Sequence, residues 1–540
     1  MNRRTRARTF NPLRRATVPC AIVLIGVAMQ WSGTARSEPS LAEIVAACEY
    51  LEPGDIPADT FQPPATAVYV ATAADGGSDA NSGTTITAPF EHLDKAIEYA
   101  NANSSTPLTI YLRSGIHSFK GAPFDPYQMI TRGNLYVTAY SSETATIRPF
   151  YWPGNPTDWG DERAFELNGS FDNITFARLR FEGWSVIFNP GSSLQTPPLR
   201  NLTVKDVTAT SFTRRNGEPG YERVLFTTGY LSDDVYGPGK IIFDDPDAAH
   251  YQVENLILSN ITVQGVDLAV NVGDENDANV KGMRITNLRV VNPTREPGAS
   301  FNDAIAVVNS YRVLIDHCRI VNINDDGIDC KSYDVAVVNC YLEGTGRNAV
   351  KFWRNGEMIN SILYNVTDIN DGAIIAEEGP FRMINSVLLG HPVGYGGTFN
   401  GDLLTTLTHK LEIVNSAFGE CKAFYINTTD LRAHNNRYFD VLDQANLIEG
   451  MLTAADVTAL NALPNCSGNA MSTNQFAHPT SGDFSLAAGS AWIDAGTTQG
   501  VLLPTFDYLG NPRMVGAGVD IGPIELQSTP TSTATWSRYD

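Results

Sequence analysis

The stretch Val253-Glu-Asn-Leu-Ile-Leu-Ser-Asn-Ile-Thr-Val263 has the same pattern as Val280-Lys-Gly-Met-Arg-Ile-Thr-Asn-Leu-Arg-Val290. In both, an apolar run leads to an asparagine, and a second apolar run follows. The pattern returns at residues 313–320, 335–342, 358–363, 383–388 and 411–418. The segment has no helical periodicity of 3.6 residues and no room for helices between the strands. These short runs therefore predict strands that are joined by turns.

The polar residue at the centre of each repeat recurs every 21 to 30 residues. A repeat of this length indicates stacked coils, in which each coil packs only on its neighbours. We therefore predict an all-β chain that forms a right-handed parallel β-helix, with a rise of about 4.8 Å per coil. The central polar side chains would then stack as a ladder at one bend. They are Asn260, Asn287, His317, Asn339, Asn360, Asn385 and Asn415.

The ends of the chain differ from this repeating centre. Phe90, Leu93, Ile97 and Ala100 share one helical face, which predicts a short amphipathic helix that caps the N-terminal end of the solenoid. A second helix is expected within 445–464. The predicted segments are an N-terminal extension at 38–65, the N-terminal cap and first coils at 66–150, the β-helix core at 151–444, a helical insertion and C-terminal cap at 445–527, and a tail at 528–540.

Residues 1–37 are typical of a signal peptide, with arginines, a short apolar stretch and a small-residue cleavage site around Ala35-Arg36-Ser37. An uncleaved membrane anchor is the alternative. Lys and Arg number 38 against 59 Asp and Glu, a net charge of −21, and removing the seven arginines of this segment gives −28. So acidic a surface argues against nucleic acid or an anionic membrane as partner. We expect a secreted monomer, extracellular or periplasmic, with no membrane contact after signal removal.

The cysteines show no metal-binding spacing and no CxxC motif. Cys48 and Cys466 could pair as a disulfide. Cys318, Cys330 and Cys340 lie within apolar repeats, where a cysteine packs as a small buried hydrophobe.

The segment 302–354 contains the most informative polar residues. Aligning its coils on the apolar residues Ile305, Ile328 and Val350 requires steps of 23 and 22 residues. Two columns of neighbours then follow, each with side chains about 4.8 Å apart on successive coils. The first column is Asp303, Asp326 and Asn348, and the second is Ala306, Asp329 and Lys351.

With Asp325 beside Asp326, the alignment brings four aspartates into one patch, together with Asp303 and Asp329. Four close carboxylates raise each other's pKa unless a cation compensates. Ca2+ takes six to eight oxygen ligands and suits such a cluster. Near a bound dication Lys351 would have a lowered pKa, as a general base requires.

Plainer interpretations of these residues stay open. Asp325-Asp326-Gly327 is also a common turn sequence, and Lys351 could be a solvated or ion-paired lysine. Arg347 and Arg354 could hold a substrate carboxylate or be ordinary surface charges.

The motifs resemble those of the family 9 polysaccharide lyases, which are pectate lyase-like β-helix enzymes. Asn302-Asp303-Ala-Ile-Ala306, Asp325-Asp326-Gly327-Ile328-Asp329 and Arg347-Asn348-Ala349-Val350-Lys351 are similar to three motifs of that family. The resemblance implies a Ca2+ site made of Asp303, Asp325, Asp326 and Asp329. It also implies that Lys351 is the base, and we expect Arg347, Asn348 and Arg354 to contact the substrate.

The activity that this resemblance implies is cleavage of an acidic, uronate-containing polysaccharide by β-elimination, at alkaline pH and only with the metal. Two alternatives remain. One is an inverting glycosidase of the polygalacturonase type, which uses an aspartate and an aspartate pair on neighbouring coils. The other is a carbohydrate-binding β-helix protein with a structural Ca2+ site.

Overall fold

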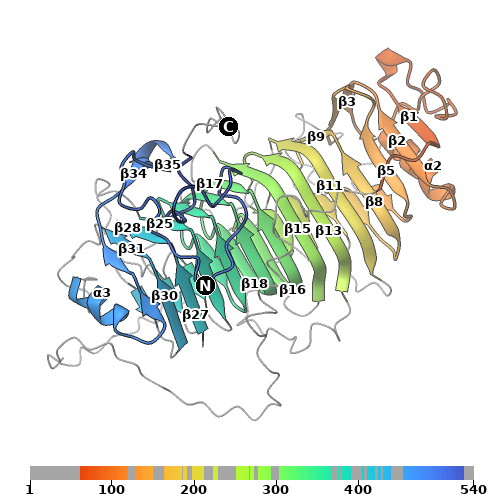
Figure 1. The fold of residues 1–540 in the computed structure, drawn as a ribbon. Coiled ribbons are helices and arrows are strands. Elements are labelled where there is room, and N and C mark those ends of the chain that lie inside the picture. The colour runs from red at the N-terminus through yellow and green to blue at the C-terminus, as the bar shows by residue number, and fades with distance from the viewer. Residues whose placement is uncertain are drawn as a thin grey trace, which may run out of the picture.

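The structure is a computed structural model that describes residues 61–119, 128–149, 163–184, 186–190, 198–211, 223–228, 251–266, 268–272, 278–292, 303–366, 374–376, 380–390, 404–406, 410–419, 424–426, 430–439 and 454–527. Within these residues, 33 strands pair in parallel in one continuous sheet that winds as stacked coils (Figure 1). This is the right-handed parallel β-helix expected from the sequence. The strands stack in three rows, one for each side of a coil.

The first row runs the length of the molecule and holds most of the predicted repeats. Its strands are β1 (Ala67–Val70), β2 (Leu108–Leu112), β5 (Leu135–Ala139), β8 (Asp172–Ala177), β11 (Leu199–Thr210), β13 (Tyr251–Val263), β15 (Ala278–Val291), the second halves of β16 (Ile305–Asp316) and β18 (Ile328–Val338), β21 (Gly356–Ile359), β24 (Phe381–Ile384), β27 (Lys410–Val414), β30 (Asp430–His434) and β32 (Cys466–Ser467).

The second row follows one bend after the first, and the later parts of β11, β13 and β15 belong to it. Its other strands are β3 (Gly115–His117), β6 (Ala145–Ile147), β9 (Leu179–Glu182), β17 (Arg319–Ile323), β19 (Tyr341–Thr345), β22 (Ile362–Tyr364), β25 (Val387–Leu389), β28 (Ala417–Gly419), β31 (Arg437–Phe439) and β33 (Ala470–Met471).

The third row closes each coil and includes the first halves of β16 and β18. Its other strands are β4 (Gln128–Ile130), β7 (Arg163–Leu167), β10 (Val186–Asn189), β12 (Val224–Thr227), β14 (Leu268–Val272), β20 (Val350–Phe352), β23 (Ile374–Ala376), β26 (Leu404–Thr406) and β29 (Phe424–Ile426). The interior between the three rows is filled by stacked apolar side chains, and Cys318, Cys330 and Cys340 are buried there as free thiols, as predicted.

The predicted ladder positions all lie at bends where the backbone is left-handed, with φ between 47° and 53°. Asparagine tolerates this conformation better than other residues with a side chain. Asn287 donates to the Asn260 Oδ1 at 3.0 Å, and Asn360 donates to the Asn339 Oδ1 at 3.1 Å. At the His317 coil the rung is supplied by the preceding residue, because Asn339 donates to Asp316 Oδ1 at 3.2 Å.

The ladder does not continue over the last coils. There the asparagine amides donate to the C-terminal segment, from Asn385 to the Asp520 carbonyl at 3.1 Å and from Asn415 to the Thr497 carbonyl at 2.9 Å. A second amide ladder that the sequence analysis missed joins the early coils. It consists of Asn134, Asn173, Asn201 and Asn255, with amide contacts of 2.9 to 3.1 Å.

Both predicted helices are present. Helix α2 (Leu93–Ala102) buries Leu93, Ile97 and Ala100 at the N-terminal end of the solenoid (Figure 1). Helix α3 (Ala454–Asn461) occupies the second half of the range 445–464, and residues 445–453 lie outside the described residues. Cys466 is a buried free thiol, and its expected partner Cys48 lies outside the described residues.

The C-terminal cap folds back along the side of the later coils. It contains the antiparallel pair β34 (Phe476–His478) and β35 (Asp483–Leu486) and the 3-10 turn η3 (Pro479–Ser481), and another such turn, η1 (Ala73–Asp75), lies near the N-terminal end. Trp492 and Ile521 of the cap are fully buried against the outer face of the second row.

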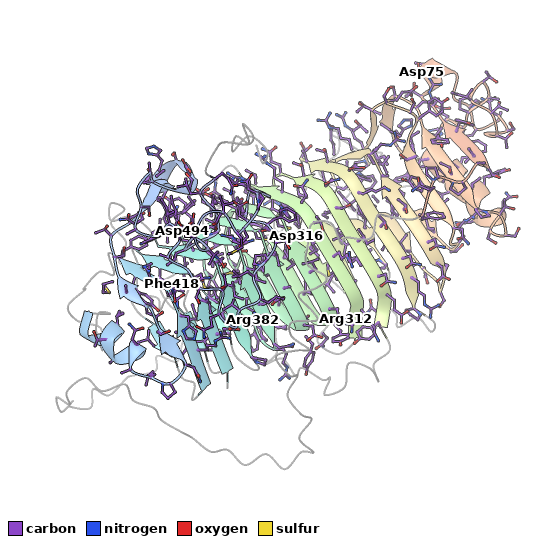
Figure 2. The ribbon with its side chains drawn as sticks, in the orientation of Figure 1. Asp75, Arg312, Asp316, Arg382, Phe418 and Asp494 are labelled. Carbon is purple, nitrogen blue, oxygen red and sulfur yellow. The ribbon has the colours of Figure 1, made fainter. Side chains whose placement is uncertain are left out.

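Val501 and Leu503 of the cap cover part of the first row. The described cap thus lies on two of the three rows, and Figure 2 marks Asp494 in it. No helix in the described part of the chain is long and apolar enough to cross a membrane.

Candidate metal centre and lysine

The predicted register of the acidic coils is the register of the structure. Ile305 pairs with Ile328, and Ile328 pairs with Val350, and all three point into the core with no exposed surface. Because side chains alternate along a strand, the next residue on each coil points outward. Asp329 therefore stands between Ala306 and Lys351 on the outer face of the third row.

Asp303, Asp326 and Asp329 form a compact group that we call the acid cluster. Each of them offers a carboxylate oxygen, and these oxygens lie within 4.8 Å of one another. Backbone amides fix two of the carboxylates, since Asp303 Oδ1 accepts from the Asp326 N–H at 3.2 Å and Asp326 Oδ1 accepts from the Asn348 N–H at 2.9 Å. The bends before β18 and β20 therefore hold the cluster in place.

The acid cluster is electrostatically unfavourable in the absence of a cation. Burial and the neighbouring carboxylates raise the pKa of Asp303 well above its usual range. Burial also raises the pKa of Asp326, although Lys351 opposes that change. A group of carboxylates that disfavours its own ionisation gains most from a bound cation.

The cluster suits a hard divalent cation on the chemistry of its donors. It presents only carboxylate oxygens, the ligand type that Ca2+ and Mg2+ prefer. The side chains of Asp326 and Asp329 are nearly buried, with 2% and 10% of their surface exposed, so few water molecules screen their charge. Asp303, Asp326 and Asp329 fit such an ion.

Lys351 lies directly beside the cluster, with its Nζ 2.5 Å from Asp326 Oδ2 and 9% of its side chain exposed. Burial opposes the ammonium charge, but Asp326 and Asp329 outweigh burial and hold the pKa of Lys351 above its ordinary value. From the sequence we expected a lowered pKa for Lys351, on the assumption of a bound dication. As long as no cation neutralises them, the carboxylates stabilise the protonated lysine instead.

Asp325, predicted as a fourth ligand, lies outside this group of carboxylates. Its Oδ1 lies 3.8 Å from Arg347 Nη1, and burial and the Asp326 charge raise its pKa to about 7. Arg347, which we expected to bind substrate, thus faces Asp325. Asn348 is fully buried and contributes its backbone amide to Asp326, and the Arg354 guanidinium lies 5.4 Å from the ring centre of Tyr333.

Two further residues lie at the cluster although we did not predict them there from the sequence. Trp353 donates its indole N–H to Asp329 Oδ1 at 3.0 Å, and Lys331 Nζ lies 3.8 Å from Asp329 Oδ2. Lys331 Nζ also lies 5.3 Å from the centre of the Trp353 ring. Both residues follow a site residue by two positions, and the alternation of a strand would have placed them on the same outer face.

Neither a protein-family model nor a curated protein sequence matches the chain. Among solved structures it is similar to pectate lyase Pel9A, at 14% identity and a TM-score of 0.35 over 86% of this chain and 98% of that one. It is also similar to the Agl-KA catalytic domain, at 11% identity and a TM-score of 0.37 over 76% of this chain and 69% of that one. A third similar structure is the surface protein and adhesin PfbA of Streptococcus pneumoniae, at 10% identity and a TM-score of 0.32 over 65% of this chain and 93% of that one. Scores this low carry no argument about activity.

Proposed function

We propose that this protein is a secreted polysaccharide lyase that cleaves a uronate-containing, pectate-like polymer by Ca2+-assisted β-elimination with Lys351 as the base. The observation that carries the proposal is the contact between the Lys351 amine and the acid cluster on adjacent coils. A purely structural cation site does not need a buried lysine, because the lysine charge competes with the ion. A lyase does need one, because it requires a base beside the cation that binds the substrate carboxylate.

Asp303, Asp326 and Asp329 would hold the Ca2+, with Asp325 at the edge of the site. Bound there, Ca2+ would neutralise the uronate carboxylate and so favour loss of the C5 proton. Neutral Lys351 takes that proton, and the C–H electron pair becomes the C4–C5 double bond. The C4–O bond breaks, and the leaving oxygen takes a proton from water. The product carries a 4,5-unsaturated uronate end.

The spacing of the carboxylates argues against the glycosidase alternative. An inverting glycosidase needs roughly 6.5 to 9.5 Å between its two carboxyl groups to fit a water molecule. The acid cluster holds its carboxylate oxygens within 4.8 Å, and one of them contacts Lys351. That arrangement suits shared cation binding better than separate acid and base roles.

The test is incubation with polygalacturonate and Ca2+, with ultraviolet absorbance followed at the new double bond and reducing ends counted in parallel. We expect absorbance and reducing ends to appear together, and both to disappear with a chelator. Reducing ends without absorbance would indicate a hydrolase. A protein that produces neither, on polygalacturonate or on other uronate polymers, would be a binding protein. A lyase that ignores the chelator would contradict the role of the acid cluster.

A further inference from the structure

Beside the acid cluster, aromatic and cationic side chains alternate along the corner between the third and first rows. We call this group the aromatic–cation band. The strand register places Lys281 next to Tyr311, and Tyr311 next to Tyr333, on successive coils. The band consists of Lys281, Tyr311, Lys331, Tyr333, Trp353 and Arg354.

Within the band each cation lies over an aromatic ring. Lys281 Nζ is 6.0 Å from the centre of the Tyr311 ring, and the Arg354 guanidinium carbon is 5.4 Å from that of Tyr333. Lys331 is 5.3 Å from the Trp353 ring. These distances are those of cation–π contacts, which favour this arrangement of rings and charges.

The band is continuous with the acid cluster. Asp329, Lys331 and Tyr333 lie at alternate positions of β18, so they point to the same side of the sheet. The Trp353 indole bonds to Asp329 directly. A polymer that reaches the cluster would therefore also lie within reach of the band.

Two nearby acidic groups also have partners outside the band. Glu254, which precedes Lys281 in the same column, lies 2.9 Å from Arg200. Asp334 accepts a hydrogen bond from the Asn355 side chain and also interacts with Tyr311 of the band. In a protein of net charge −21, the band still gathers three cations, Lys281, Lys331 and Arg354, beside the cluster of described residues that suits a cation.

We infer that the aromatic–cation band is an extended subsite that binds the polyanionic chain beside the acid cluster, with the polymer running along the solenoid axis over the coils from Lys281 to Trp353. Successive coils are about 4.8 Å apart, which is similar to the length of one sugar in an extended polysaccharide. Each coil can then meet one uronate residue, with rings stacking on sugar faces and cations meeting carboxylates. The inference rests on the proposed function for its substrate class.

Affinity electrophoresis of the full chain through gels with and without polygalacturonate, all with EDTA, tests the band without requiring cleavage. We expect the polymer to retard the wild type, and Lys281→Ala and Tyr311→Ala each to weaken binding by roughly two- to fivefold, the size of one cation–π contact at an exposed site. Added salt should weaken the retardation, because it screens the charges. Fully methyl-esterified polygalacturonate, which is neutral, should not retard the protein.

The matched controls come from equivalent pairs on the N-terminal coils. Lys205 Nζ is 5.6 Å from the Tyr136 ring centre, and the Arg113 guanidinium carbon is 5.4 Å from that of Tyr140. Lys205→Ala and Tyr140→Ala should bind like the wild type. Lys281→Gln, which keeps most of the side-chain stem, replaces Lys281→Ala if thermal unfolding shows that the alanine variant is misfolded.

The results separate the two hypotheses. Three results would reject the band as a polymer-binding subsite. They are equal retardation of the wild type and the band variants, retardation by the neutral polymer, and no retardation of the wild type. The ultraviolet assay decides the lyase activity independently. A wild type that binds through the band but produces no unsaturated ends would keep the band and reject the lyase.

Discussion

Lys351 holds a proton that it must lose before it can act as a base, because Asp326 lies 2.5 Å away. We predict that Lys351→Ala lowers kcat by about 10²- to 10⁴-fold, the usual contribution of a general base. Lys351→Arg should not restore activity, because a guanidinium stays protonated. The rate of ultraviolet absorbance change on polygalacturonate measures both variants. Substantial activity in Lys351→Arg would exclude Lys351 as the base. The control is Lys95→Ala, which changes an exposed ion pair with Glu98 in the N-terminal helix α2.

The pKa of Lys351 also predicts how pH and calcium act together. Without a cation, Asp326 and Asp329 hold this pKa above its ordinary value against the effect of burial. A bound cation neutralises the same carboxylates, so the pKa of Lys351 should fall as the calcium concentration rises. In the proposed mechanism the neutral lysine is the active form, so we expect activity to increase with pH. We expect pH–rate profiles to shift to lower pH at higher calcium concentration, and a profile that calcium leaves in place would contradict this coupling.

Trp353 offers a readout of metal binding that needs no substrate. Its indole donates to Asp329 Oδ1 at 3.0 Å, so an ion that draws this carboxylate away should change the fluorescence of the indole. We predict that Ca2+ titration changes the emission of the wild type and that Trp353→Phe loses most of that change. Asp326→Asn should weaken the calcium dependence in both proteins. An unchanged signal in Trp353→Phe would place the responding tryptophan elsewhere.

On the first row, charged side chains alternate in a column over four coils, of which Glu357, Arg382 and Glu412 are buried and Arg432 is partly exposed. Arg382 Nε lies 2.8 Å from Glu412 Oε2, and Glu412 Oε1 lies 2.6 Å from Arg432 Nη1. Arg382 also faces Glu357 at 3.4 Å, and Figure 2 marks its position. Register alone creates this column, because the four residues are successive partners in the strand pairing.

Removing the central cation of this column should destabilise the coils. Arg382→Ala leaves two buried glutamates without it, and we predict a loss of about 3 to 5 kcal/mol of unfolding free energy. Lys95→Ala breaks the exposed pair with Glu98 and should cost at most about 1 kcal/mol. Chemical denaturation of both variants checks the difference. Equal losses would mean that the column contributes no more than a surface pair.

Strand register could be predicted at this scale because the chain repeats itself. The apolar residues Ile305, Ile328 and Val350 fixed the alignment, and Asp329 and Lys351 followed from counting. The second ladder has a similar sequence pattern, since Asn173 and Asn201 each precede a leucine or isoleucine in a strand. It was harder to predict because its spacing is less regular. The position of Asp325 could not be derived, because it lies in a bend, where alternation does not apply.

For the whole molecule, the placement of the C-terminal cap could not be obtained by counting. Its anchors join residues far apart in the sequence, such as Arg513, which donates to Asn360 Oδ1 across 153 positions. No periodicity connects such pairs. The cap buries Trp492 against the second row and packs Leu503 on the first, while the acid cluster lies on the third. The described cap residues thereby lie on the first and second rows and leave the acid cluster on a different side.

The cap should also make stability depend on pH near neutrality. Burial raises the pKa of Glu525 to about 7, although it lies 3.6 Å from Arg513 and accepts backbone N–H bonds from Val515 and Asp520. Its folded pKa is above the unfolded value of 4.5, so its favourable contribution is complete below pH 4.5 and is lost as the pH rises through 7.

Glu525→Gln stays neutral and loses one accepting oxygen, which is a cost at every pH. Relative to the wild type, we therefore expect the variant to gain stability as the pH rises from acid to neutral, by up to roughly 3 kcal/mol. Thermal unfolding of both proteins in saturating Ca2+, from mildly acidic to mildly alkaline pH, measures the difference and keeps the acid cluster equally loaded in both. A difference in Tm that does not change with pH would show that Glu525 is ionised in the folded cap throughout and that its pair with Arg513 outweighs its burial.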